Sequence, residues 1–462
     1  MTNRAGVLAP PLGFAPIADP WAKLAAFLIV GYLGLGKPFA YIGLPWISVY
    51  IGEMALAMFL FFGPELRQGA WLALTRRITP LRNFNRLLLL SLLYGGFASL
   101  HGILVGYPVL TALRDTAFNY YPIFLLLGIW VGLRDASFLI RVTRMLALWA
   151  GCYGFAYVVF LNRIPWTMPG TDGRVPVFLG PYGASTVALL GLLSFEPKLG
   201  RVWHLLLLNF FVLLGVQVRA EWTGLAAAVL VFAWLTRKLK RLALIAGAMA
   251  ALFALMYATH LDLDTPTGRG DTVGSRISAD FLLARAIAPV SEDLAGRLAD
   301  QSHVTFAAGT TEWRLVWWAN IWAEVHSRLS NSLVGFGYGY PIGDLNPEIE
   351  PGMFIQTPHN DLLYALAFSG WPGVALFALL QLEIGRLLWR SFKLTASPFG
   401  LVCWAAFLTM SLFEDLFEAP FAAIPCFLLL GAALAPALLA PARARRQSAP
   451  PGRMPQASQA AN

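Results

Sequence analysis

Apolar residues fill twelve stretches of the chain, and short polar or basic segments separate most of them. A helix that crosses the hydrocarbon core of a bilayer needs about 20 predominantly apolar residues, and most of these stretches approach that length. We therefore predict an all-α polytopic membrane protein with about 12 transmembrane helices. The expected helices are 24–36, 46–63, 87–107, 119–133, 145–162, 176–195, 202–217, 222–236, 242–259, 361–382, 399–417 and 421–440.

One connection, residues 260–360, is far longer than an ordinary loop. It begins with Pro, Gly and Asp, continues with helical patterns at about 276–300 and 311–328, and ends in the glycine-rich stretch "GFGYGYPIG". We expect that stretch to form a tight turn that returns the chain to the bundle. The predicted organisation is a cytoplasmic tail at 1–23, helices at 24–259, a periplasmic loop with amphipathic helices at 260–360, helices at 361–440, and a disordered cytoplasmic tail at 441–462.

Composition and charge agree with a membrane protein and give its orientation. Only 13% of the residues are charged and 58% are hydrophobic, whereas soluble domains carry about 25% charged residues. The net charge of +9 is not distributed as in a nucleic-acid-binding surface. Basic residues concentrate in alternate connections, for example between positions 67 and 86 and in "RKLKR" at 237–241. The positive-inside rule then places both termini in the cytoplasm and the loop 260–360 outside.

The segment "TPHNDLLYALAFSGWPG" at 357–373 places polar groups at the start of an apolar helix on the outer face. Pro358 disfavours helix at Thr357, so the helix is expected to begin just after it. The positive end of the helix dipole would favour a neutral His359, which can accept a proton as a general base. Asn360 or Asp361 can cap the helix. Without other residues, an interfacial histidine beside a capped helix is an equally good interpretation.

Two arginines on the outer face are candidates for binding an anion. Arg219 lies in "GVQVRAEWTG" between two predicted helices, where a cation close to hydrocarbon snorkels, pairs with an acid such as Glu221, or binds an anion. Arg314 shares a helix face with Trp317 and Trp318. That helix is either an amphipathic lid on the outer leaflet or a site for a lipid-linked phosphate, whose oxygens suit the planar guanidinium.

Other polar residues carry weaker signals. Arg174 is a further cation of the outer face, and Glu414, Asp415 and Glu418 gather at the outer end of the helix predicted at 399–417. The sequence around these acids offers no His or Cys, so we expect no metal ion and no cofactor. Glu53 lies inside a predicted helix and is either functional or hydrogen-bonded within the bundle.

Taken together, these parts resemble the O-antigen ligase/polymerase superfamily of bacterial membrane proteins. The resemblance rests on "GRVPVFLGPYGASTVALLGLL", on the arginine turn at Arg219, on "WRLVWWANIWAEV" followed by "LVGFGYGYP", and on "PHNDLLYALAFSGWPG". The chain departs from the family at Val218, where a serine often precedes the arginine. That departure puts any role for the serine hydroxyl in doubt.

The resemblance implies a glycosyltransferase of the bacterial inner membrane that acts at the periplasmic face in surface-polysaccharide assembly, as a polymerase or as a ligase. The donor would be an undecaprenyl-pyrophosphate-linked glycan, and the acceptor a sugar hydroxyl of a glycan or of the lipid A core. The reaction would be inverting and metal-independent. Membrane lipids and other polysaccharide-assembly proteins would be the further partners of the protein. A transporter or flippase of lipid-linked glycans is the alternative, and a non-catalytic scaffold is a third. Candidate catalytic residues are His359, Arg219 and Arg314, and candidate substrate-binding residues are Arg174, Asn360, Trp317, Trp318 and Glu414.

Overall fold

The structure is a computed structural model, and it describes residues 17–44, 49–63, 79–169, 171, 175–264, 276–288, 291–297, 301–346 and 357–447. These parts of the chain are all-α apart from two antiparallel pairs of two-residue strands, β1 (Gly43–Leu44) with β2 (Val49–Tyr50) and β3 (Leu263–Asp264) with β4 (Arg276–Ile277). The expected all-α class is therefore confirmed.

Each of the twelve apolar stretches overlaps a helix of the structure, although the helix predicted at 176–195 begins only at Ala184. In chain order the helices of the bundle are α1 (Pro20–Leu35), α2 (Lys37–Ala40), α3 (Ile51–Phe62), α5 (Arg82–Val105), α6 (Val109–Asp115), α7 (Ala117–Tyr120), α8 (Ile123–Arg134), α9 (Phe138–Val159), α10 (Ala184–Phe195), α11 (Trp203–Val216), α12 (Arg219–Thr236), α13 (Leu239–Ala258), α18 (Asp361–Thr395), α19 (Phe399–Met410) and α20 (Pro420–Gln447).

The number of complete membrane spans is smaller than the number of apolar stretches. Among the described residues, α5, α9, α13, α18 and the Pro420–Leu438 part of α20 are long and apolar enough to cross a bilayer. A sixth span results if Val109–Tyr120 and Ile123–Arg134, which are bent by 43° at their junction, count as one. The apolar helices α1, α3, α10, α11 and α19 are shorter. The count of about 12 spans thus stays a prediction.

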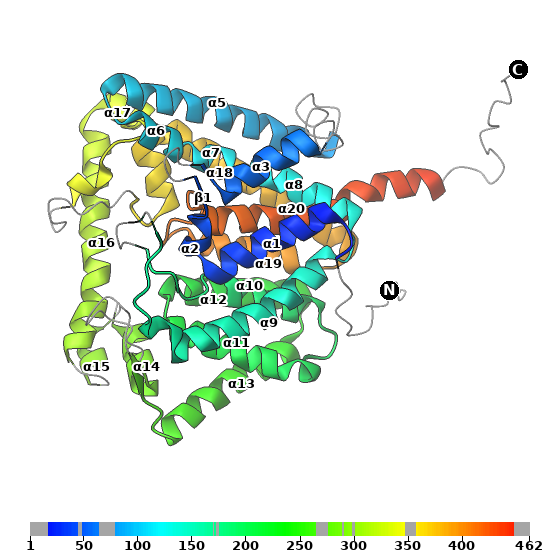
Figure 1. The fold of residues 1–462 in the computed structure, drawn as a ribbon, viewed down its shortest axis with the longest axis vertical. Coiled ribbons are helices and arrows are strands. Elements are labelled where there is room, and N and C mark those ends of the chain that lie inside the picture. The colour runs from blue at the N-terminus through cyan, green and yellow to red at the C-terminus, as the bar shows by residue number, and fades with distance from the viewer. Residues whose placement is uncertain are drawn as a thin grey trace, which may run out of the picture.

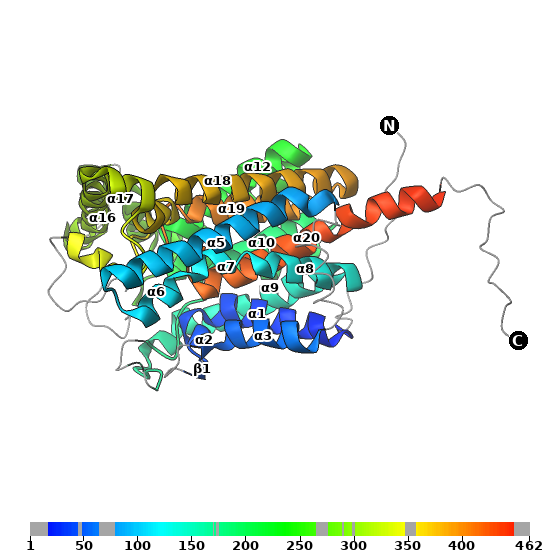
Figure 2. The same ribbon diagram turned by 90° about the horizontal axis from the view of Figure 1, so that it is seen from above.

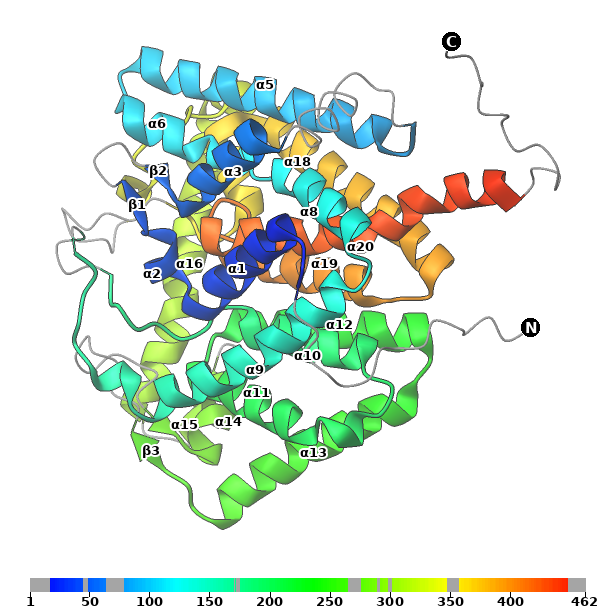
Figure 3. The same ribbon diagram turned by 45° about the vertical axis from the view of Figure 1, so that its right-hand side comes forward.

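The helices of the bundle lie side by side, and the long helix α16 (Gln301–Ser327) runs across one end of them (Figure 1). The view from above places α16 and α17 (Leu329–Val334) at that same end (Figure 2). The start of α1 and the end of α20 lie at the opposite end (Figure 3). Both ends of the described chain are therefore on one side of the bundle, which agrees with an even number of crossings.

The long connection carries more helix than its sequence pattern indicated. The pattern at 276–300 divides into α14 (Ala279–Ile287) and α15 (Glu292–Gly296). The pattern at 311–328 begins earlier, because α16 starts at Gln301. At the other end of the chain, α20 continues to Gln447, so the described part of the tail 441–462 is helical. Residues 1–16 and 448–462 of the two tails lie outside the described residues.

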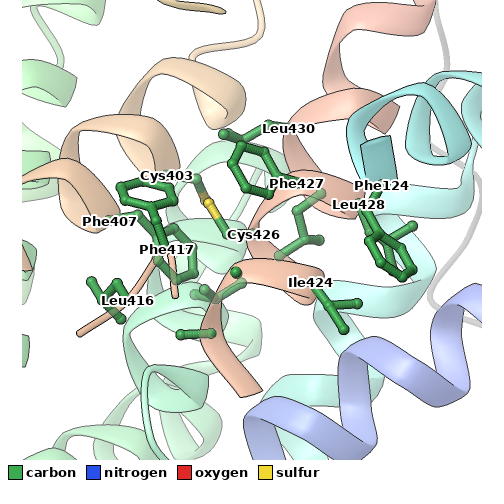
Figure 4. Packing of buried hydrophobic residues seen from close by; sticks show 14 of the residues in the cluster. Phe124, Cys403, Phe407, Leu416, Phe417, Ile424, Cys426, Phe427, Leu428 and Leu430 are labelled. Carbon is green, nitrogen blue, oxygen red and sulfur yellow. The ribbon is translucent and has the colours of Figure 1, made fainter. Parts of the chain in front are cut away.

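Close backbone contact holds α8 against α20 in the centre of the bundle. A Cβ on Gly128 would lie 2.2 Å from the carbonyl oxygen of Leu428, and a Cβ on Gly431 would lie 2.1 Å from that of Leu125. Small residues that let two helix backbones approach are the usual basis of helix association in lipid. Phe124, Phe427, Cys403 and Cys426 are all buried in the hydrophobic core beside this contact, and both cysteines are free thiols (Figure 4).

The glycine-rich stretch re-enters the bundle where α18 is broken. Gly370 has φ +64°, so the helix is interrupted there and nearby carbonyls lose their intrahelical partners. The amide of Phe336 donates to the carbonyl of Ala367 at 2.7 Å, and that of Gly337 donates to Phe368 at 3.2 Å. Backbone groups inside a membrane bundle need such partners. The glycine-rich segment therefore stabilises the break in α18 by supplying these donors.

Candidate functional site

His359 lies in a strained backbone conformation immediately before α18. Asn360 is the N-cap of this helix, and its Oδ1 accepts hydrogen bonds from the amides of Leu362 and Leu363 at 3.0 and 3.1 Å. His359 has φ +52°, in the left-handed region that side chains other than Gly, Asn and Asp rarely adopt. Strain of this kind is concentrated at functional sites because surrounding contacts must maintain it.

The imidazole of His359 faces the carboxylates of two residues that lie far from it in the sequence, Glu414 and Asp415. Its Nδ1 lies 2.6 Å from Oδ1 of Asp415 and 3.2 Å from Oε2 of Glu414. Both acids lie in the loop between α19 and α20, because α19 ends at Met410. The predicted helix 399–417 extended too far, since "FEDLFEAPF" forms this loop. About a quarter of the side chain of His359, 27%, remains exposed, so a substrate can reach it.

The start of α18 fixes the position of the acidic loop. Asp361 is buried, and its Oδ2 accepts hydrogen bonds from the amides of Leu416 and Phe417 at 3.1 and 3.0 Å. The side-chain Nδ2 of Asn360 donates to the carbonyl of Leu412 at 3.0 Å. The loop that carries Glu414 and Asp415 is therefore held by the same turn of chain that presents His359. Both polar atoms of the Asn360 amide are therefore used structurally: its oxygen caps α18, and its nitrogen contacts the acidic loop.

Helix α16 supplies the second cation of the site. Nη1 of Arg314 donates to the carbonyl of Phe413 at 2.8 Å, and Nη2 donates to Oε1 of Glu414 at 3.2 Å. One turn along α16, Nε1 of Trp318 donates to the carbonyl of Pro358 at 2.6 Å. Through these contacts α16 holds both the acidic loop and the residue that precedes His359.

The site is an alternating row of charges: Arg314, Glu414, His359 and Asp415. Burial alone would lower the pKa of His359, but the carboxylate of Asp415, with that of Glu414, raises it to about 10. Burial opposes ionisation of Asp415, yet the imidazolium and the hydroxyl of Thr357, which donates to Asp415 at 2.6 Å, hold its pKa well below its usual range. The expectation of a neutral His359 near pH 7 is therefore wrong. The two carboxylates outweigh the helix dipole.

Arg219 lies beside this row rather than within it. It is the first residue of α12, and the charges that act on it are those of Arg314 and Glu414. Just before it, Gln217 has φ +58°, and its Oε1 accepts a hydrogen bond at 2.6 Å from Nη1 of Arg285 on α14. The neighbouring Glu221 is buried and accepts a hydrogen bond from Thr186 at 3.3 Å.

The remaining predicted residues have different positions. Trp317 is completely buried and its Nε1 donates to the carbonyl of Ile342 at 3.0 Å, so this side chain packs inside the outer layer. Arg174 lies outside the described residues. Glu53 is in the first turn of α3 and accepts hydrogen bonds from the hydroxyls of Tyr120 at 2.8 Å and Tyr121 at 3.3 Å. Hydrogen bonding within the bundle, one of the two interpretations of Glu53, is what the structure shows.

Three side chains of the site have the geometry of a possible metal site. Ligand atoms of His359, Glu414 and Asp415 all lie within 4.8 Å of one another. The sequence around the acids contains no histidine, but the fold brings His359 to them. Each carboxylate nevertheless already has a cationic partner, Arg314 for Glu414 and His359 for Asp415. A metal ion would have to displace both cations.

Chelation of divalent metals is therefore expected to leave the activity of the protein unchanged. The measurement is the rate of product formation by the purified protein before and after treatment with EDTA. A loss of activity that is restored by magnesium or manganese would instead identify the three side chains as a metal site.

Two contributors to the site were not recognisable from the sequence. Arg285 lies in "ADFLLARAI", where a single basic residue in a mainly apolar helix was the available signal. Thr357 was noted only as the residue before Pro358, and its contact with Asp415 depends on two segments far apart in the chain.

Comparison with known proteins gives one family. Residues 204–378 match the family model described as O-Antigen ligase, which confirms the resemblance to the O-antigen ligase/polymerase superfamily over this part of the chain. The matched segment contains Arg219, Arg314 and His359, and Glu414 and Asp415 follow it. No curated protein matches the chain. The family supports a role in surface-polysaccharide assembly and a glycosyltransferase-type activity. The apolar helices agree with a multi-pass membrane protein.

Proposed function

We propose that the protein transfers a glycan from an undecaprenyl-pyrophosphate donor to a sugar hydroxyl at the periplasmic face of the inner membrane, because residues 204–378 match the family model described as O-Antigen ligase. The observation that supports this function best is the row of Arg314, Glu414, His359 and Asp415 at one end of the bundle, with Arg219 beside it. A transporter would concentrate its ionisable groups near the bilayer midplane instead.

In such a transfer the arginines would stabilise the negative charge of the leaving group. The bond between the anomeric carbon of the donor and the pyrophosphate oxygen breaks, and the electron pair remains on the lipid pyrophosphate as negative charge. Arg219 and Arg314 are the two predicted site cations that can stabilise that charge in a site poor in water. Because Arg314 is held through Phe413 and Glu414, its guanidinium is positioned before the substrate arrives.

His359 is the proposed general base. The acceptor hydroxyl attacks the anomeric carbon from the face opposite the leaving group, and its proton passes to Nε2 of the imidazole. Asp415 faces Nδ1, so it orients the ring with Nε2 free for the acceptor and stabilises the imidazolium that forms. A single displacement of this kind inverts the anomeric configuration, and both electrons and the proton are accounted for without a metal ion.

This role predicts a characteristic pH dependence. The base must be neutral, and the pKa of His359 is raised to about 10. The fraction of neutral imidazole therefore increases with pH throughout the neutral range, and kcat/KM is expected to rise about tenfold per pH unit below that pKa. In Asp415→Asn the carboxylate that raises the pKa of His359 is absent, while burial still lowers that pKa. The pH profile of kcat/KM is therefore expected to level off at a lower pH than in the wild type. A wild-type profile that is flat between pH 6 and 9 would contradict the base assignment.

The function itself is tested by deleting the gene and analysing the surface glycans and the lipid-linked intermediates. Single repeat units on the acceptor would indicate that a polymerase is lost. Full-length chains that remain on undecaprenyl pyrophosphate would indicate that a ligase is lost. In either case a plasmid with the wild-type gene is expected to restore the product, and one with Arg219→Ala is not. Unchanged glycans after deletion would contradict both forms of the proposal.

A further inference from the structure

Two exposed tryptophans stack at the end of the bundle that lies opposite the candidate site. Helix α12 begins with Arg219 and α18 begins just after His359, and both helices run from the site toward the end of the bundle farthest from α16 (Figure 2). Near their far ends the rings of Trp234 and Trp389 are stacked, with centroids 5.6 Å apart and planes at 22°. The side chain of Trp234 is 68% exposed and that of Trp389 is 36% exposed. Neither indole N–H donates a hydrogen bond among the described residues, so both are available to a ligand.

Exposed cations surround this pair of tryptophans. Basic residues follow each tryptophan in the chain, and these are Arg237, Lys238, Lys240, Arg390 and Lys393. All five are exposed, and none forms an ion pair in the part of the chain that the structure describes. Nζ of Lys393 lies 5.2 Å from the centre of the Trp389 ring. Glu383, the acid that precedes them on α18, is already paired with Arg386. This end of α12 and α18 therefore carries positive charge that no described side chain neutralises.

Apolar side chains continue the same two helix faces toward the middle of the bundle. Leu230 lies one helical turn before Trp234 and Leu382 lies two turns before Trp389, so each leucine shares a face with its tryptophan. Both leucines are exposed. Along these faces the surface is thus apolar, then aromatic, then cationic. A phospholipid has the matching order of acyl chains, ester region and phosphate, and indole rings favour the interface between them.

The general bias of charge between the two ends of the bundle does not explain this arrangement. The positive-inside rule accounts for the number of basic residues at this end. It does not require cations of two helices far apart in the sequence to gather around exposed aromatic rings. Lys23, near the start of α1, is an exposed cation of the same end, and it lies on the opposite side of the bundle from α12 and α18 (Figures 2 and 3). Basic residues gathered between membrane helices beside the headgroup region are typical of binding sites for anionic lipids.

We propose that the surface formed by Trp234, Trp389 and the five cations binds the phosphate headgroup of an acidic phospholipid, whose acyl chains lie along the exposed leucines. The phosphate oxygens accept hydrogen bonds from the guanidinium, ammonium and indole N–H groups, and the negative charge neutralises the cations. This site is separate from the proposed reaction, because it lies at the other end of the bundle. Since α12 carries Arg219 and α18 follows His359, a lipid that bridges the far ends of these helices also ties together the two elements that position candidate catalytic residues.

The test measures binding of cardiolipin to the purified, delipidated full-length protein in detergent by native mass spectrometry. A basic residue beside an anionic headgroup contributes about fivefold in affinity, or about 1 kcal/mol. We therefore expect Lys393→Gln to weaken binding about fivefold and Arg390→Gln/Lys393→Gln to weaken it about 25-fold. Trp234→Leu, which keeps an apolar side chain but removes the indole N–H and the ring stack, is expected to weaken binding as well. Lys23→Gln is the matched control and is expected to bind as wild type.

Each alternative has its own result. Wild-type affinity for cardiolipin in both the double variant and Trp234→Leu would overturn the inference. An equal loss of affinity in Lys23→Gln would also overturn it, because binding would then follow the net charge of the protein. Equal binding of phosphatidylethanolamine, which has no net charge, would overturn the choice of an acidic headgroup, and full competition by inorganic phosphate would overturn the choice of a lipid. Gene deletion tests the transfer reaction independently, so failure of either proposal leaves the other standing.

Discussion

Replacement of His359 with asparagine is expected to lower the rate of glycan transfer by about 10²–10⁴-fold, the usual contribution of a general base. Asparagine tolerates the left-handed backbone at this position, where φ is +52°, and its amide cannot accept the proton of the acceptor. The loss is therefore expected in kcat rather than in folding. The measurement is product formation by membranes that contain equal amounts of each variant.

His326→Asn is the matched control for this experiment. His326 lies on α16 in the same outer layer and is exposed. Its Nδ1 contacts the carbonyl of Trp322 at 2.7 Å, and its ring lies against Trp322 and Trp371. The control variant is expected to retain activity. Wild-type rates in His359→Asn would remove His359 from the mechanism, whatever the other variants show.

Replacement of Arg314 with alanine is expected to lower the transfer rate by about 10²–10³-fold, the typical effect of removing one donor that stabilises developing negative charge. Two causes combine in this variant. The guanidinium no longer faces the leaving pyrophosphate, and the loop at Phe413 and Glu414 loses its contact with α16. Activity is measured beside the thermal unfolding of the purified protein.

Arg314→Lys separates these two causes. Lysine keeps the positive charge but cannot donate from two fixed positions to both Phe413 and Glu414. A rate between those of wild type and Arg314→Ala, at unchanged unfolding temperature, would indicate a direct role of the charge. Arg328→Lys, at an exposed arginine before α17, is the control and is expected to behave as wild type. Full activity of Arg314→Ala would contradict the proposed role.

Local signals in the sequence were sufficient for the start of α18. Pro358 and the capping Asn360 are adjacent, and the structure begins the helix at Asp361. The partners of His359 could not be found in this way. Asp415 lies more than 50 positions away, behind two helices, and its contact with the imidazole depends on how α18, α19 and the acidic loop pack. The same packing reverses the expected charge state of the histidine.

The ends and breaks of helices inside the bundle could not be predicted from the local sequence pattern either. An apolar run continues past Met410, so the sequence favours a longer α19, but the chain turns there because Asp361 and Asn360 provide partners for the backbone of the loop. The break at Gly370 is similar. A glycine and Pro372 permit it, and the distant amides of Phe336 and Gly337 make it stable.

The sequence by itself determined the class of protein, the apolar helices, the family resemblance and three candidate residues, Arg219, Arg314 and His359. Hydrophobic runs and the placement of arginines act locally, so they can be read without a fold. The tertiary structure alone decided the row of alternating charges, the protonation of His359 and the contact between Arg285 and Gln217. These depend on distances between segments far apart in the chain, because electrostatic interactions and burial act through space rather than along the sequence.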